Sequence, residues 1–133
     1  MAERKTIEND ASVRDFLKNI ENDKRREDSL VLAKLMRSIS RKQAKMWGPS
    51  IVGFGKHQYQ YADGKPGEIC KIGFAPRVQA LVLYLSNFDG RAKLLKKLGK
   101  HRMSGGGCLY INKLDDIDLD VLTSIIGQAH EIS

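Results

Sequence analysis

Apolar residues in the first third of the chain recur at the spacing of one helical face, in two separate segments. In the first segment, Val13, Phe16, Leu17 and Ile20 follow the i, i+3, i+4, i+7 pattern behind Ser12, a candidate N-cap. In the second segment the same spacing is repeated by Leu32, Leu35, Met36 and Ile39. The pattern predicts two helices, the second capped by Asp23 and ending before Gly48-Pro49, a step that stops helical structure.

Beyond Pro49 the apolar period changes to two, which is typical of strands. Alternation runs from Val52 and Phe54 on to His57, Tyr59 and Tyr61, and turn residues at 63–67 separate this stretch from the alternating run of Cys70, Ile72 and Phe74. Pro76-Arg77 marks a second, tighter turn. The segment 78–85 is almost continuously apolar, which favours a central strand covered on both faces. Because the connections are short, we expect these strands to form an antiparallel meander.

The last third of the chain predicts a helix, a strand and a final helix. Leu94, Leu95 and Leu98 form an apolar stripe between Asp89, a candidate cap, and Gly99, which suits a helix C-terminus. A short strand pattern follows at 108–111. Four aspartates at positions 115, 116, 118 and 120 then place negative charge at the start of a last amphipathic helix.

The predicted order is therefore α-α-β-β-β-α-β-α. This order is that of an α+β fold in which helices pack on one face of an antiparallel sheet, consisting of a meander plus one later strand. The length of 133 residues and the absence of linkers or repeats predict one domain, residues 1–133, with residues 1–10 as a frayed tail.

Composition and charge narrow the possible functions only slightly. No apolar run approaches the roughly 20 residues that span a bilayer, and no secretory leader pattern is present, so we expect a cytoplasmic protein. Cys70 and Cys108 are isolated and fit small buried hydrophobes. The net charge of +7 makes nucleic acid a possible partner, because lysine and arginine neutralise phosphates.

Aromatic residues next to one arginine are the first candidate site. If part of a sheet face is open, these side chains could line a pocket for a planar or anionic ligand; ordinary core packing with hydroxyl groups at the rim is the alternative. The candidate ligand-binding residues are Trp47, Tyr59, Tyr61, Arg77 and Tyr84. No motif for nucleophilic, acid–base or metal catalysis is present, and we predict neither an enzyme nor a bound cofactor from the residues themselves.

A basic segment is the second candidate site. The residues that could bind an anion or nucleic acid are Lys93, Lys96, Lys97, Lys100 and Arg102. A helix would place the four lysines on its solvent face, opposite its leucines. An ordinary solvated helix surface has the same pattern and is the alternative interpretation.

Several short motifs together resemble the YdhG-like bacterial domain of unknown function, over residues 12 to the C-terminus. They are Met46-Trp47-Gly48-Pro49, Gly53-Phe54-Gly55, Tyr59-x-Tyr61, Ile72-Gly73-Phe74-Ala75-Pro76-Arg77, Leu83-Tyr84-Leu85, Cys108-Leu109-Tyr110-Ile111 and Leu114-x-Asp116-Ile117-Asp118. The resemblance implies a shape related to frataxin, and some relatives carry the label iron chaperone.

Iron is the only cofactor that this resemblance implies, and frataxin-type binding uses exposed carboxylates. The nearest candidates in this chain are Asp15, Glu21, Asp23, Glu27 and Asp28, which are interleaved with lysine and arginine. Our leading hypothesis is a non-catalytic binding protein for a small ligand or a protein partner. A frataxin-like iron carrier and a nucleic-acid accessory protein that uses the basic segment are the alternatives.

Overall fold

The computed structural model describes residues 8–60, 64, 66–104 and 108–132. In these residues the α-helices are α1 (Val13–Lys18), α2 (Asp23–Ser40), α3 (Arg91–Leu98) and α4 (Leu119–Ile132), with a 3-10 turn η1 (Leu114–Asp116) before α4. The strands are β1 (Glu8–Asn9), β2 (Ala44–Trp47), β3 (Ile51–Phe54), β4 (His57–Gln60), β5 (Pro66–Ile69), β6 (Ile72–Pro76), β7 (Leu81–Leu85), β8 (Arg102–Met103) and β9 (Leu109–Ile111).

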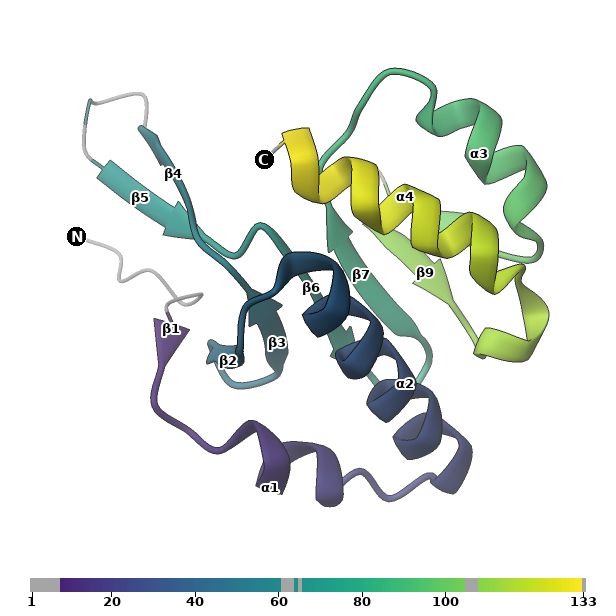
Figure 1. Cartoon of the computed structure of the whole chain (residues 1–133). Coiled ribbons are helices and arrows are strands. Elements are labelled where there is room, and N and C mark those ends of the chain that lie inside the picture. Colours follow the sequence, from purple (N-terminus) through teal and green to yellow (C-terminus); the bar gives the residue numbers. More distant parts are fainter. Residues whose placement is uncertain (1–7, 61–63, 65, 105–107, 133) are drawn as a thin grey trace.

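Seven of these strands form one open antiparallel sheet in the order β1-β2-β3-β6-β7-β9-β8 (Figure 1). Strands β4 and β5 form a separate antiparallel pair that projects away from the helices. Strands β6 and β7 occupy the centre, a position that the apolar pattern of 78–85 predicts for β7. The α+β class with an antiparallel sheet is therefore confirmed.

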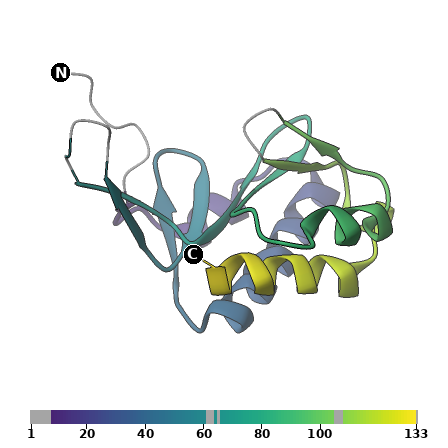
Figure 2. The same ribbon diagram turned by 90° about the horizontal axis from the view of Figure 1, so that it is seen from above.

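The helices gather on one side of the sheet, as Figure 2 shows from above. Alternate strand residues point toward them, among them Phe54, Phe74 and Leu83, all fully buried. Helices α2 and α4 supply the opposing side of this core, for example with Leu32 and Ile126. The period of two in the strands and of 3.6 in the helices thus buries one face of each element in a single main core.

The element order is richer in strands than predicted. Helix α2 ends at Ser40 because Arg41 adopts a left-handed backbone conformation (φ 59°), and the next residues form β2, where the sequence suggested no strand. Glu8 and Asn9, inside the predicted frayed tail, pair with β2 as β1. Val78 was expected in the central strand but lies in the turn before β7 and is 99% exposed.

The predicted helix caps are confirmed at α1 and corrected at two other helices. The Ser12 hydroxyl accepts a hydrogen bond from the Asp15 N–H at 3.1 Å, as expected. At α2 the cap is Asn22 instead of Asp23, since the Asn22 side chain accepts from the Arg25 N–H at 2.8 Å. At α3 the cap position is occupied by Gly90, not Asp89, and no side chain caps the helix.

Candidate functional site

The sheet face opposite the helices carries a second, smaller apolar cluster, and we call this side of the sheet the open face. The buried members of the cluster are Trp47, Ile51, Cys70, Ala75 and Val82. Half-buried Tyr84, Tyr110 and Cys108 pack against them. These side chains come from strands and the segments next to them, and no helix of the described residues lies over this face (Figure 2).

Trp47 lies within this cluster and not at the surface, which corrects its prediction as a ligand contact. Its side chain is 1% exposed. A Cβ built on Gly53 would lie 2.5 Å from Trp47 Cδ1 and 2.6 Å from Cys70 Cβ, so the indole ring occupies space that a larger residue at 53 would fill. The same burial raises the pKa of the Cys70 thiol to about 12.

Two of the candidate residues, Arg77 and Tyr84, come together on the open face. The β6–β7 turn is closed by a hydrogen bond from the Arg77 N–H to the Ala80 carbonyl at 3.0 Å. From this turn the Arg77 side chain reaches Tyr84, and its Nη2 donates to the Tyr84 hydroxyl at 3.2 Å. This hydrogen bond is the main cause of a raised pKa for the exposed guanidinium, which therefore stays charged.

A second arginine–tyrosine pair lies beside the first and was not predicted. The guanidinium carbon of Arg102 lies 4.3 Å from the centre of the Tyr110 ring, a cation–π arrangement. Tyr110 pairs with Arg102 on one side and with Val82 on the other. Tyr84 is two residues beyond Val82 on β7, so the two tyrosines are diagonal neighbours, about 7–8 Å apart between Cα atoms.

Tyr59 and Tyr61 cannot be assigned to this site. Tyr59 belongs to β4, where its backbone pairs with Gly67, and its side chain is outside the described part of the structure. Tyr61 lies outside the described residues altogether.

The predicted basic segment is divided between two sides of the molecule. Lys93, Lys96 and Lys97 are exposed on α3, which lies on the helical side of the sheet (Figure 1). Lys100 and Arg102 follow the end of this helix, and Arg102 reaches the open face through β8. The five residues therefore do not form one surface, because Gly99 ends the helix with a φ of 114°.

The five carboxylates proposed for iron do not converge either. Asp28 is buried, where it accepts a hydrogen bond from the Leu114 N–H at 3.0 Å and lies 3.0 Å from Lys24 Nζ. Asp23 pairs with Arg26 at 2.7 Å. The other three, Asp15, Glu21 and Glu27, are exposed. Within the described residues, no group of three histidine, cysteine or acidic side chains is arranged to hold a metal ion.

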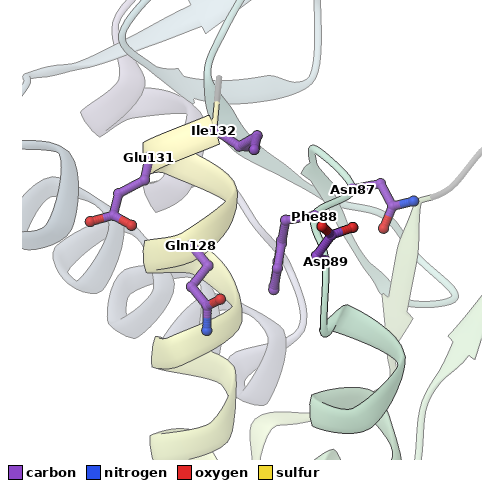
Figure 3. Close-up of a pocket in the computed structure, with 6 residues that line it drawn as sticks. All are labelled: Asn87, Phe88, Asp89, Gln128, Glu131 and Ile132. Atoms are coloured by element: carbon purple, nitrogen blue, oxygen red, sulfur yellow. The ribbon is translucent and has the colours of Figure 1, made fainter.

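A pocket of about 460 Å³ lies between α4 and the segment before α3 (Figure 3). It is lined by Asn87, Phe88, Asp89, Gln128, Glu131 and Ile132. In Figure 3 the Glu131 side chain points away from the segment that carries Asp89, so the two carboxylates of the pocket do not face each other. The two carboxylates of the pocket therefore do not converge on one ligand position.

The chain shows no significant match to any protein-family model, curated protein or solved structure. In the described part of the chain, no helix is both long enough and apolar enough to span a bilayer. The candidate site consists of two exposed guanidinium groups, each held against a half-buried tyrosine, on a sheet face that no helix of the described residues covers.

Proposed function

We propose that this protein binds single-stranded nucleic acid on the open face of its sheet and acts by binding, not by catalysis. The observation that carries the proposal is the pairing of Arg77 with Tyr84 and of Arg102 with Tyr110. This conclusion replaces the basic segment as the nucleic-acid surface, since only Arg102 of that segment lies on the open face.

The two kinds of side chain supply the two contacts that a single strand needs. Unpaired bases stack on aromatic rings, which contributes about 1–3 kcal/mol per base, and also on the planes of arginine side chains. The guanidinium groups also attract phosphates, and arginine forms paired hydrogen bonds with phosphate oxygens. A duplex hides its bases inside the stack, so a flat tyrosine–arginine face favours a single strand.

The remaining surface is compatible with this partner. The net charge of +7 attracts a polyanion over a long range. We also propose a frataxin-like shape, which the resemblance to YdhG-like domains implies, and a cytoplasmic location, which would give access to single-stranded RNA. A small planar anion would contact the same four side chains, and the experiment below separates it from a longer strand.

The test is fluorescence anisotropy with labelled single-stranded DNA and RNA of about 12 nucleotides, a length within the range of single-strand sites. We expect Tyr110→Leu to weaken binding by about tenfold, because one stacking contact is lost. Arg102→Gln should weaken binding and reduce the salt slope by about one. The control is Lys96→Gln, which removes the same charge from α3 and should change the affinity by less than about twofold.

Equal losses in Arg102→Gln and Lys96→Gln would contradict the proposal, because binding would then follow net charge and not the open face. Tighter binding of duplex than of single-stranded DNA would contradict it too. If a mononucleotide competes as effectively as the unlabelled 12-mer, the ligand is a small planar anion and not a nucleic acid.

A further inference from the structure

A cavity of about 570 Å³ lies at the end of the sheet where α2 ends and β2 begins. Its lining includes Lys42, Lys45, Lys56 and Lys71, with Glu8 as the carboxylate, and we call it the lysine pocket. The four lysines come from four separate segments: the link after α2, strand β2, the link between β3 and β4, and the link before β6. The fold therefore assembles them, and none of the sequence motifs contains them.

Backbone contacts fix the positions from which these lysines extend. The Lys42 N–H donates to the Ser40 hydroxyl at 3.1 Å, directly after the left-handed end of α2. The Lys71 N–H donates to the Phe54 carbonyl at 3.2 Å. The aliphatic stem of Lys71 crosses Gly55, where a Cβ would come within 3.3 Å of its Cγ and Cδ, and Gly55 has a φ of 72° that favours glycine.

Among the described residues that line the pocket, positive charge exceeds negative charge. These residues include four lysines and one carboxylate, and Lys56 Nζ lies 3.3 Å from Glu8 Oε1. The positive charge extends to His130 near the end of α4. Burial lowers the pKa of His130 most, and the charges of Lys71 and Lys42 lower it further, while Glu131 acts in the opposite direction.

We infer that the lysine pocket binds the di- or triphosphate group of a small phosphorylated compound. Lysine binds phosphate as a compact point charge, and several lysines around one cavity match a multiply charged anion. The cavity volume is within the range of small-molecule sites. Lys71 and Arg77 flank opposite ends of β6, roughly 20 Å apart along the strand, so this site is distant from the Arg77–Tyr84 pair.

The test is calorimetric titration of the full chain with inorganic triphosphate and with orthophosphate at constant ionic strength. The double variant Lys42→Gln/Lys45→Gln should weaken triphosphate binding by about tenfold or more. The matched control Lys93→Gln/Lys96→Gln removes the same charge from α3 and should change the affinity for triphosphate by less than about twofold. Triphosphate should bind more tightly than orthophosphate, because it offers more charge to the lysines.

The pKa of His130, followed by NMR and assigned with His130→Gln, gives a second readout. Bound triphosphate should raise this pKa, because it neutralises the lysine charges that lower it. Equal weakening in both double variants, or a His130 pKa that triphosphate leaves unchanged, would overturn the inference. It would also be overturned if Lys42→Gln/Lys45→Gln weakened only the binding of single-stranded DNA, since the pocket would then hold the phosphates of a strand. Variants of the open face test the proposed function separately.

Discussion

Replacing Gly53 by alanine tests how Trp47 packs beneath the open face. The added methyl group would lie 2.5 Å from Trp47 Cδ1, 2.6 Å from Cys70 Cβ and 2.8 Å from Trp47 Nε1. Real Cβ contacts essentially never fall below 3.0 Å. Trp47 is 1% exposed and Cys70 is 5% exposed, so neither side chain can move into solvent without opening the cluster.

The expected cost follows from this overpacking. Extra methyl groups in a well-packed site lower the free energy of unfolding by about 1–3 kcal/mol. Because the new methyl group would contact two buried side chains, we expect Gly53→Ala to fall in the upper half of this range, about 2–3 kcal/mol. The unfolding entropy of a 133-residue domain is about 0.28 kcal/mol/K, so 1 kcal/mol corresponds to about 3.6 °C. We therefore expect the melting temperature to fall by about 7–11 °C.

Gly127→Ala is the matched control, because it makes the same chemical change in the opposite environment. Gly127 lies within α4, and a Cβ there would meet nothing within 4 Å. Alanine should stabilise this helix by about 0.5–1 kcal/mol, raising the melting temperature by about 2–4 °C. The melting temperatures of both variants are measured by thermal unfolding. Unfolding is followed by circular dichroism and by the fluorescence of Trp47, the single tryptophan.

A double-mutant cycle makes the result specific to the indole ring. Trp47→Leu removes the ring that the new methyl group would meet, so Gly53→Ala should cost much less in the Trp47→Leu background. The reasoning is refuted if Gly53→Ala unfolds within about 0.5 kcal/mol of the unchanged protein, or if the two substitutions are simply additive.

Two further predictions concern buried groups. Asp28→Ala should lower the free energy of unfolding by about 2–3 kcal/mol in urea, because it leaves the buried Leu114 N–H without its acceptor and removes one of the two carboxylates beside Lys24. Asp115→Ala removes the other carboxylate on Lys24, at 3.1 Å and 72% exposed, and should cost less than about 0.5 kcal/mol; equal costs would contradict the assignment. In a Cys108→Ser variant, Cys70 should resist a thiol reagent at pH 8 until the chain is unfolded, because burial raises its pKa to about 12. The buried Cys70 thiol contributes fully to stability below the unfolded pKa of about 9. This contribution is lost as the pH rises from 9 toward 12, because the thiol ionises first in the unfolded chain. Rapid labelling of the native variant would disprove the burial of Cys70.

The sequence predicts the elements that bury a long periodic face and misses those that are held by pairing alone. Helix α2 and strands β6 and β7 are recognisable because their apolar positions repeat several times. Strands β1 and β8 contain two residues each, too few for any period, and their positions depend on partners far along the chain. Strand β2 follows a helix that ends on a left-handed arginine, where the usual signal would be glycine.

The candidate site was predicted in part for a similar reason. Arg77 and Tyr84 are close in sequence across a short turn, so their meeting follows from the hairpin. Tyr110 could have been placed on the same face from the alternation of Leu109, Tyr110 and Ile111. The position of Arg102 needed the register of β8 against β9, which no local pattern contains.

The burial of Trp47 connects the packing of the sheet to the shape of the open face. Gly53 and Gly73 occupy neighbouring positions on β3 and β6 and leave the sheet surface without side chains there. The indole ring fills the space over Gly53, which is why the largest aromatic residue of the chain is hidden, not presented. The half-buried tyrosines on the following strands pack over buried Ala75 and Val82, and their arginine partners stay exposed. The surface that we propose for a single strand therefore consists of the two arginine–tyrosine pairs and excludes the indole ring.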